Sequence, residues 1–323
     1  MNPKSPEFDL IARHFTRPAR NAVLGVGDDC ALVDVSNGMD LAVSVDTMVS
    51  GVHFFSDADP ETLGHKALAV NLSDMAAMGA MPYWAMLALT VPEVNHDWLA
   101  KFAKGFFDLA EEFGVSLIGG DTTRGPLTIT VTIMGEVPAG AALRRSGAKA
   151  GNDVWVSGNL GDAALAVAHR RGLLKLEEGE YREAVMRLYE PMPRVSLGQA
   201  LRGLATSAID ISDGLLADLD HICTLSKVGA TIEEELLPVS SIGAVHIETP
   251  AGLTAVVAGG DDYELCFTAP QNARENIEQL TEILGVPLTR IGQIRKGRGV
   301  SLVASDGKPI AVDGRGFDHF TAS

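Results

Sequence analysis

Residues 207–216 read SAIDISDGLL, an apolar run that leads into an acidic turn and then into a second apolar run. The first run predicts a strand over Ser207–Ile211, and the second begins a helix predicted over Leu215–Ser226. Asp210 lies near the end of this strand, while Ser212 and Asp213 lie where the helix would begin. The segment therefore predicts a strand and a helix joined by a carboxylate-rich turn.

Similar acidic segments occur along the whole chain, most of them beside glycine or at a predicted strand end. Their carboxylates are hard oxygen ligands of the kind that Mg²⁺ prefers, usually one or two per ion with substrate phosphates and water. One such segment would be an ordinary turn, but their number across both halves predicts a site with several metal ions that holds a polyphosphate. The six segments are Gly27-Asp28-Asp29, Ser44-Val45-Asp46, Asn71-Leu72-Ser73-Asp74, Gly119-Gly120-Asp121, Asp210-Ile211-Ser212-Asp213-Gly214 and Gly259-Gly260-Asp261-Asp262.

The composition is that of a globular protein with a strongly acidic balance. The chain has 323 residues, long enough for two domains, with 46% hydrophobic and 21% charged residues. It carries 42 Asp and Glu against 26 Lys and Arg, a formal charge of -16. Such a chain should repel nucleic acid, so we expect no nucleic-acid partner. A phosphorylated ligand would need divalent cations to neutralise its charge.

The cysteines and the N-terminus bear on the location of the protein. Cys30, Cys223 and Cys266 are odd in number and lack CxxC spacing, which argues against a disulfide framework and a zinc site. Residues 1–10 are polar and contain two prolines, so no signal peptide is visible. The uncharged segment Met75–Val91 is short for a membrane span and is interrupted by glycine and proline, which indicates a helix end followed by a buried strand. We expect a cytoplasmic protein with no membrane partner.

Strands and helices are mixed without strict alternation, which favours an α+β fold over a doubly wound parallel sheet. The Ala- and Gly-rich segment Pro138–Asn152 has no clear period, so we predict an N-terminal domain over residues 1–137 and a C-terminal α/β domain over residues 138–323. The predicted strands are Leu41–Val45, Tyr83–Val91, Val115–Ile118, Leu127–Val137, Val154–Ser157, Ser207–Ile211, Ala230–Leu237, Thr254–Ala258, Glu264–Thr268, Thr289–Ile294 and Val300–Val303. The predicted helices are Ser5–Phe15 with Ser5 as its N-cap, Pro60–Met78, His96–Phe113, Asp162–Arg170, Arg182–Tyr189, Leu215–Ser226 and Gln271–Leu284.

Several familiar ways of handling phosphate or metal are missing from the sequence. There is no GxxxxGK[ST] segment, which excludes a P-loop, and no HRD or DFG set of the protein-kinase kind. The sequence also lacks His-rich or Cys-rich metal spacing, which argues against zinc hydrolysis. No Ser or Cys has a recognisable base partner, so we expect no covalent nucleophile. The remaining possibility is a site in which carboxylates bind hard cations.

Each candidate in the N-terminal half has a structural and a functional interpretation. Asp29 follows Gly27 in a tight turn that gathers carboxylates, or it belongs to an ordinary Asp-rich turn. Asp46 ends a predicted strand, where it would hold a ligand or cap the following loop. Asp74 lies on an apolar helix one turn after Asn71, and a carboxylate there must be paired or metal-bound to offset its desolvation. The residues favour a metal role for Asp74 and leave Asp29 and Asp46 open.

The remaining candidates also have two interpretations each. Gly120 and Asp121 follow a predicted strand, so paired glycines would expose N–H groups to a phosphate while the carboxylate holds its metal. Ser212 would be a plain N-cap, or the helix N-terminus that it opens would bind an anion. Arg145 lies in a basic loop that is either solvated surface or a bidentate clamp over phosphate. His53 is interpreted as a half-buried core histidine.

Taken together, the motifs resemble the thiamine-monophosphate kinase family of the aminoimidazole ribonucleotide synthetase superfamily. The order and number of the motifs make the resemblance specific, although single motifs recur across the superfamily. It extends from about residue 7 to the terminal Gly316-Phe317-Asp318-His319-Phe320. The other segments that carry it are Gly27-Asp28-Asp29-Cys30-Ala31, Val45-Asp46-Thr47, Gly51-Val52-His53-Phe54, Asn71-Leu72-Ser73-Asp74-Met75-Ala76-Ala77-Met78-Gly79, Gly119-Gly120-Asp121-Thr122, Arg145-Ser146-Gly147-Ala148, Ser157-Gly158, Leu160-Gly161-Asp162, Asp210-Ile211-Ser212-Asp213-Gly214-Leu215 and Gly259-Gly260-Asp261-Asp262-Tyr263-Glu264-Leu265.

This resemblance implies an N-terminal ATP- and metal-binding domain with a mixed sheet that packs in a dimer, and a C-terminal α/β sandwich domain. It also implies a Mg²⁺-dependent homodimer that converts ATP and thiamine phosphate into ADP and thiamine diphosphate. The family often has Glu where this chain has the shorter Asp261. The family's metal positions correspond to Asp29, Ser44, the Val45 backbone, Asp46, Asp74, Asp121, Asp210 and Asp213. Its ATP contacts correspond to Gly120, Asp121, Arg145 and Ser212, and its thiamine phosphate contacts to His53, Asp261 and Phe317.

We therefore expect a kinase that acts by positioning, in which Mg²⁺ ions bridge carboxylates to both phosphates for a direct in-line transfer without a dedicated base. One alternative is an ATP-dependent synthetase of the same superfamily, although His53 and Phe317 suit an aromatic, cation-bearing acceptor such as thiamine. A second alternative is a non-catalytic metal or nucleotide sensor, which would bind ATP without turnover. The residues expected to act in catalysis are Asp46, Asp74, Asp121 and Asp210.

Overall fold

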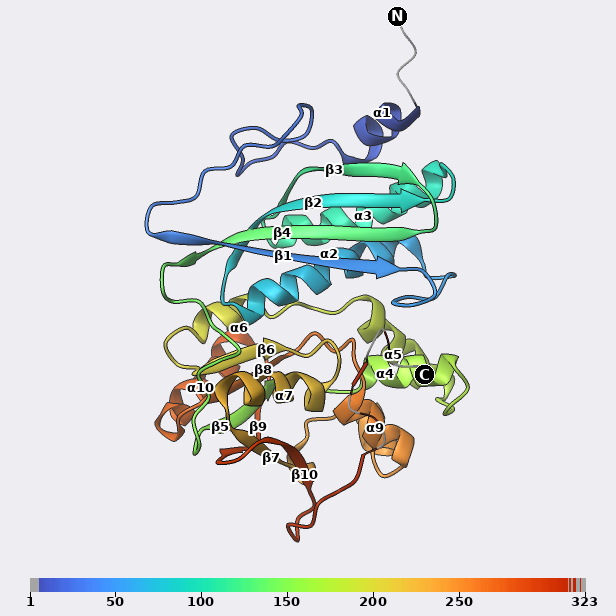
Figure 1. The fold of residues 1–323 in the computed structure, drawn as a ribbon. Helices are drawn as coiled ribbons and strands as arrows, with labels where there is room; N and C mark the ends of the chain where they lie inside the picture. The colour runs from blue at the N-terminus through green and yellow to red at the C-terminus, as the bar shows by residue number, and fades with distance from the viewer. Residues whose placement is uncertain (1–5, 313, 315, 318–319, 321–323) are drawn as a thin grey trace, which may run out of the picture. The chain divides into compact units, whose positions relative to one another are not determined.

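The computed structural model describes residues 6–312, 314, 316–317 and 320. The chain divides into two compact units (Figure 1). Unit 1 comprises residues 1–75 and 80–140, and unit 2 comprises residues 76–79 and 141–323. Within the described part of the chain, no helix combines the length and the apolar character that crossing a bilayer requires.

Unit 1 is built on a four-stranded sheet with the strand order β1-β4-β2-β3. β1 and β2 each run antiparallel to β4, while β3 runs parallel to β2, so the sheet is mixed, as predicted for the N-terminal part. The strands are β1 (Met39–Val49), β2 (Met81–Val91), β3 (Ser116–Arg124) and β4 (Thr128–Pro138).

One face of this sheet is covered by α2 (Pro60–Ala77) and α3 (His96–Glu112), which lie behind the strands in Figure 1. α3 begins after Asn95, whose side chain accepts two backbone N–H groups of the first turn. Phe102 and Phe106, spaced by one helical turn, are both fully buried. The helical period of the aromatic residues therefore marks a core face, as the sequence predicted.

The predicted first helix is present in two parts. α1 (Pro6–Leu10) continues into the π-helical turn η1 (Ile11–Phe15), and the ring of Phe15 packs edge-on against Phe102. The predicted N-cap Ser5 lies outside the described residues. The aromatic contact attaches this segment to α3.

The other face of the unit 1 sheet carries exposed apolar side chains. Along β1, Leu41, Val43 and Val45 are 42%, 57% and 59% exposed, while the residues between them are half-buried. Met86 of β2 is 40% exposed. This alternation is typical of a strand with one covered face, except that here the open face is apolar.

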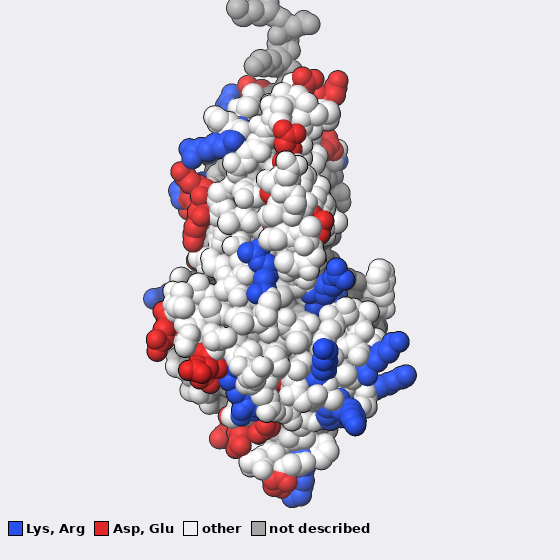
Figure 2. All heavy atoms as spheres, turned by 90° about the vertical axis from the view of Figure 1, so that its left-hand side faces the viewer, with Lys and Arg blue, Asp and Glu red and all other residues white. Residues whose placement is uncertain are grey.

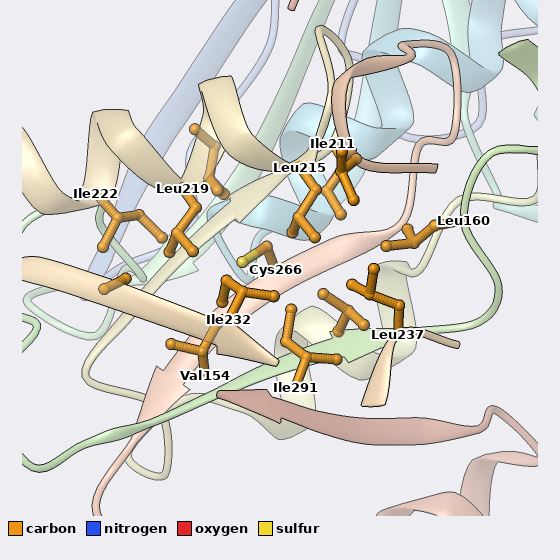
Figure 3. Packing of buried hydrophobic residues seen from close by; sticks show 14 of the residues in the cluster. Val154, Leu160, Ile211, Leu215, Leu219, Ile222, Ile232, Leu237, Cys266 and Ile291 are labelled. Atoms are coloured by element: carbon orange, nitrogen blue, oxygen red, sulfur yellow. The ribbon is translucent and has the colours of Figure 1, made fainter. Parts of the chain in front are cut away.

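Unit 2 contains a six-stranded mixed sheet with the strand order β10-β7-β9-β5-β8-β6. Its core is shown in Figure 3, where Val154, Ile232, Cys266 and Ile291 come from four different strands. The strands are β5 (Asp153–Ser157), β6 (Ser207–Asp210), β7 (Gly229–Glu233), β8 (Leu265–Ala269), β9 (Leu288–Arg295) and β10 (Gly299–Val303).

α7 (Leu215–Ser226) places Leu215, Leu219 and Ile222 on this core at helical spacing (Figure 3). The strand, turn and helix predicted from residues 207–216 are therefore present. The other helices of unit 2 are α4 (Asp162–Arg170), α5 (Glu178–Tyr189), α6 (Val195–Ala200), α8 (Ser241–His246), α9 (Pro250–Ala258) and α10 (Arg274–Leu284), with 3-10 turns η2 (Glu234–Leu236) and η3 (Gln271–Ala273).

The strand predicted over Thr254–Ala258 is wrong, because this segment is the second half of α9. Its apolar, β-branched residues resemble a strand by composition. The helix is specified earlier, by Thr249, whose side chain accepts a backbone N–H, and by Pro250 at the first helical position. The short helices α6 and α8 were not predicted.

Two strands extend further than the sequence suggested. The segment Gly119–Thr122, predicted as a loop after a strand, lies inside β3 and is paired with β2. Asp46, predicted at the end of a strand, lies within β1 opposite Val131. Glycine and polar residues have a low intrinsic preference for strands. Here they are strand residues because they pair with long neighbouring strands.

The surface charge is uneven despite the formal charge of -16. On the face shown in Figure 2, Lys and Arg side chains and Asp and Glu side chains form separate groups. A ligand therefore experiences the charge of the residues around it, not the formal charge of the whole chain.

Candidate active site

Unit 1 contains a pocket of about 720 Å³, which lies in the usual size range for a small-molecule site. The N-terminal helical segment forms one wall, the acidic turn at residues 27–31 forms another, and β2 and β3 form the base. Among the predicted site residues, the pocket brings together Asp29, Gly120 and Asp121. Its lining residues are Glu7, Ile11, Ala12, Phe15, Thr16, Val26, Gly27, Asp28, Asp29, Cys30, Ala31, Met86, Leu87, Leu117, Ile118, Gly119, Gly120, Asp121 and Thr122.

The two glycines at the base of this pocket have different steric environments. A Cβ on Gly120 would lie 1.9 Å from the carbonyl oxygen of Leu87, so only glycine allows β3 to approach β2 here. A Cβ on Gly119 would meet only the Met86 side chain, at 3.6 Å. Gly120 is therefore required for strand pairing, whatever it contacts in a ligand.

The lining of the pocket is acidic. Among the residues that the structure describes, four carboxylate residues and no Lys or Arg line it. A polyphosphate placed there would be repelled unless cations came with it. Mg²⁺ takes one or two carboxylates and completes its shell with phosphate oxygens and water, so the donor set suits this ion. The four residues are Glu7, Asp28, Asp29 and Asp121.

A second group of predicted ligands lies where β1 meets α2. The Ser44 hydroxyl donates a hydrogen bond of 2.5 Å to Oδ2 of the half-buried Asp74. One turn earlier on α2, Asn71 is 1% exposed, and its Oδ1 is buried without a hydrogen-bond partner. Asp46 is two residues from Ser44 on the same side of β1. An unpartnered buried oxygen beside a carboxylate and a hydroxyl suits a hard cation.

These two groups in unit 1 are separate. The strand register runs from Asp46 through Val131 and Leu87 to Gly120, which is three strand spacings, or roughly 14 Å. One ion cannot be bound by both ends of that row. In agreement, no three His, Cys, Asp or Glu side chains of the described chain are grouped closely enough to hold a metal without other ligands.

His53 is half-buried, as the sequence predicted, and its role is visible in part. It follows β1, and its Nδ1 accepts a hydrogen bond of 3.0 Å from the Val49 backbone N–H. Because Nδ1 is an acceptor, a neutral ring carries its proton on Nε2. The ring is therefore oriented by the backbone of the strand that precedes it.

In unit 2, the beginning of α7 differs from the prediction. Ser212 is not the N-cap, which is Gly214. The Asp218 carboxylate instead accepts the backbone N–H groups of Ser212, Asp213 and Gly214 at 3.0–3.1 Å. The N–H groups expected to bind an anion are therefore already occupied by a side chain. Burial and the neighbouring Asp213 raise the pKa of Asp218 to about 7, although these three hydrogen bonds act in the opposite direction.

Five predicted residues of unit 2 lie together around this turn. The Ser212 carbonyl accepts the backbone N–H of Asp261 at 2.9 Å, and the Asp213 carbonyl accepts that of Phe317 at 3.1 Å. Asp210 ends β6 two residues before Ser212 and is buried. Phe317 is 45% exposed. Backbone hydrogen bonds thus join segments that are distant in sequence.

Arg145 is anchored elsewhere in unit 2. Its carbonyl lies 3.4 Å from the hydroxyl of Ser226, at the C-terminal end of α7, whereas Ser212 lies at the N-terminal end. The twelve residues of α7 span about 18 Å. The side chain of Arg145 is exposed. It would have to extend along α7 to approach the turn that contains Ser212.

Sequence reasoning assigned no role to several residues that the structure places at these sites. Asp28 and Cys30 line the pocket, Asp218 closes the turn before α7, and Glu264 is bound by Arg194. Asp28, Cys30 and Glu264 lie inside the quoted motifs, so the sequence could have identified them as candidate site residues. The sequence carries no comparable signal for Arg194.

Comparisons with known proteins show which family the chain is similar to. Residues 27–137 match the family model "AIR synthase related protein, N-terminal domain", and residues 149–305 match "AIR synthase related protein, C-terminal domain". The chain is 47% identical over 318 residues to the thiamine-monophosphate kinase of Escherichia coli (strain K12), covering 97% of this chain and 98% of the relative.

Two solved structures have the same fold. The crystal structure of thiamine-monophosphate kinase from Stenotrophomonas maltophilia K279a has a TM-score of 0.84 and 46% identity, covering 94% of this chain and 96% of the other. A structure described as "AaThiL complexed with AMPPCP and TMP" has a TM-score of 0.77 and 29% identity, covering 99% of each chain. Because the identity is high over almost the whole of both chains, this chain belongs to the thiamine-monophosphate kinase family of the AIR synthase related proteins.

Proposed function

We propose that the chain transfers the γ-phosphoryl group of ATP directly to the phosphate of thiamine phosphate, giving ADP and thiamine diphosphate. The observation that carries this proposal is the acidic pocket of unit 1, where Asp29, Gly120 and Asp121 meet and the described lining residues include no Lys or Arg. A triphosphate there requires divalent cations. The relative whose printed description names AMPPCP and TMP supports a nucleotide donor and a phosphorylated acceptor.

Mg²⁺ is the cation that we propose. It would neutralise the phosphates and stabilise the charge that develops during an in-line transfer. The hard oxygen donors and the unpartnered Oδ1 of Asn71 suit it. Because the two groups in unit 1 are roughly 14 Å apart, we propose that each binds its own ion. The proposed ligands are Asp29, Ser44, the Val45 carbonyl, Asp46, Asp74 and Asp121 in unit 1, and Asp210 and Asp213 in unit 2.

The chain's own residues mainly bind and orient the two substrates. Gly120 and Asp121 would contact ATP from the base of the pocket, and Arg145 and Ser212 are proposed ATP contacts in unit 2. His53, Asp261 and Phe317 are proposed contacts of thiamine phosphate. The accepting phosphate oxygen is already anionic near neutral pH, so no residue needs to remove a proton from it.

The test is incubation of the purified protein with ATP, Mg²⁺ and thiamine phosphate, followed by mass analysis of the products. We expect equal amounts of ADP and thiamine diphosphate, and neither product when EDTA replaces Mg²⁺. Thiamine in place of thiamine phosphate is the matched control, since it lacks the accepting phosphate. ATP binding without ADP release would favour the sensor, and ADP release with another acceptor only would favour a synthetase.

We also propose that the chain forms a homodimer through the open face of the unit 1 sheet. Leu41, Val43, Val45 and Met86 expose apolar area there, and a contiguous exposed apolar surface marks an interaction site. A self-complementary pairing of this face would remove it from water. Light scattering of the wild-type chain should give a dimer, and Val45→Lys should give a monomer. A wild-type monomer at micromolar concentration would contradict this proposal.

A further inference from the structure

The segment Gly259–Leu265 of unit 2 contains two residues with an unusual backbone. Asp261 has φ 70° and Tyr263 has φ 50°, in the left-handed region that non-glycine residues seldom adopt. Among the described non-glycine residues, only Lys227 shares it, and Lys227 ends a helix, where this conformation is common. A bulky tyrosine there is strained, and such strain persists only where the surroundings impose it.

The backbone of this segment is held by the turn that precedes α7. The N–H of Asp261 donates to the Ser212 carbonyl at 2.9 Å, and the N–H of Tyr263 donates to the Ile211 carbonyl at 2.8 Å. A Cβ on Gly260 would lie 2.3 Å from the Ser212 carbonyl oxygen, so the two segments are in close contact. These contacts fix where the backbone of residues 260–263 lies.

The alternate side chains anchor the segment to the core. Glu264 is 7% exposed and accepts both Nε and Nη2 of Arg194 as well as the Ser157 hydroxyl. Oδ1 of Asp262 accepts the Gly161 N–H at 2.9 Å, and its Oδ2 is buried without a partner. Burial raises the pKa of Asp262 well above its usual range. Residues 262 and 264 are therefore buried anchors for the residues between them.

The anchoring of residues 262 and 264 affects the two left-handed residues, Asp261 and Tyr263. With 262 and 264 directed inward, Asp261 and Tyr263 lie on one side of the segment. The Tyr263 hydroxyl donates a hydrogen bond of 3.0 Å to Oδ1 of Asp261. The two left-handed residues are therefore joined to each other by a side-chain hydrogen bond.

We propose that Tyr263 is a positioning residue, which orients the Asp261 carboxylate toward the cationic, aromatic part of thiamine phosphate. This inference rests on the proposed function, in which Asp261 contacts that substrate. The hydroxyl binds one carboxylate oxygen of Asp261 and thereby restricts the rotation of the group.

The test compares the KM values of the two substrates in Tyr263→Phe, which removes only the hydroxyl. We expect the KM for thiamine phosphate to rise about tenfold, because one hydrogen bond to a charged group is lost. The KM for ATP and the melting temperature should stay unchanged. Tyr181→Phe is the matched control, because that tyrosine stacks on His169 elsewhere in unit 2 and should leave all three values unchanged.

A double-mutant cycle with Asp261→Asn adds a readout that a purely structural role would not move. If Tyr263 acts through Asp261, Tyr263→Phe should add little to the effect of Asp261→Asn. Fully additive effects, or an equal rise in both KM values, would overturn the positioning role. A wild-type protein that makes no thiamine diphosphate would overturn the proposed function together with this inference. An active wild type with an unaltered Tyr263→Phe variant would overturn the inference alone.

Discussion

The acidic segments of unit 1 and unit 2 look alike in sequence but have different surroundings. In unit 1, Asp29 and Asp121 are exposed in an open pocket, and no Lys or Arg is found among its described lining residues. In unit 2, Asp210, Asp218 and Glu264 are 4%, 2% and 7% exposed. Asp218 and Glu264 are bound by backbone N–H groups and by an arginine, respectively.

This difference separates two uses of a carboxylate. An exposed carboxylate in an acidic pocket keeps its charge and its free lone pairs, which a cation can take up. A buried carboxylate must be neutralised or fully hydrogen-bonded, so it is more useful as an anchor for the backbone. The predictions below test whether unit 1 serves mainly the chemistry and unit 2 mainly the placement of its turns.

The largest expected effect is the loss of the Arg194–Glu264 ion pair. Arg194→Met leaves a buried carboxylate without its partner and should lower the free energy of unfolding by about 3–5 kcal/mol. Urea denaturation measures this change. Arg182→Met is the control, because its partner Glu178 is 90% exposed and the pair should contribute about 0–1 kcal/mol. Equal effects of both substitutions would remove the distinction between anchors and surface pairs.

Asp74→Asn should affect chemistry without affecting the fold. The amide oxygen still accepts the Ser44 hydroxyl, but the charge that a cation requires is lost. We expect kcat to fall roughly 10²–10³-fold with an unchanged melting temperature. Asp108→Asn is the control, since Asp108 is an exposed residue of α3 that pairs with the exposed Lys104 one turn earlier. A folded, fully active Asp74→Asn enzyme would contradict a metal role for unit 1.

The two glycines at the base of the pocket provide a matched pair. Gly120→Ala introduces a Cβ 1.9 Å from the Leu87 carbonyl oxygen and should destabilise the protein by about 1–3 kcal/mol. Gly119→Ala meets only the Met86 side chain and should be tolerated. Thermal unfolding of the two variants measures the difference. If both alanine variants are as stable as wild type, the close approach of β3 to β2 does not require glycine at position 120.

The smallest effect concerns the pH dependence of stability. Burial and the neighbouring Asp213 raise the pKa of Asp218 from an ordinary 3.8 to about 7 in the folded chain. Since the folded state holds the proton more tightly, this group's stabilising contribution is full below about pH 4 and is lost as the pH rises through about 7. The Asn side chain of Asp218→Asn does not titrate, so the variant does not lose this stabilising contribution as the pH rises. The melting temperature of the variant relative to wild type should therefore rise by about 2–4 °C between about pH 5 and about pH 8.

A constant difference between Asp218→Asn and wild type across this pH range would contradict the prediction. Asp220→Asn, two residues away on the exposed side of α7, is the control for a general charge effect. It should show no comparable dependence on pH.

Most helices and strands could be predicted because their apolar residues recur at helical or strand spacing. α4 and α7 were predicted at the bounds that the structure has. α9 was not, because an apolar run that is buried all round has no period, and its capping residue Thr249 lies five positions before the predicted strand. The extent of β1 and β3 depended on neighbouring strands, which a local pattern does not include.

The sequence alone determined the acidic segments, the mixed α+β fold and the family. All three follow from local patterns and motifs. Which carboxylates stay open and which become anchors depended on tertiary contacts. Ser212 is the plainest case: as a residue before a helix it has the chemistry of an N-cap, yet the N-cap is Gly214 and the Ser212 N–H is bound by Asp218. Burial, strand pairing and hydrogen bonding between distant segments set the role of a charged group, and none of them is encoded at a single position.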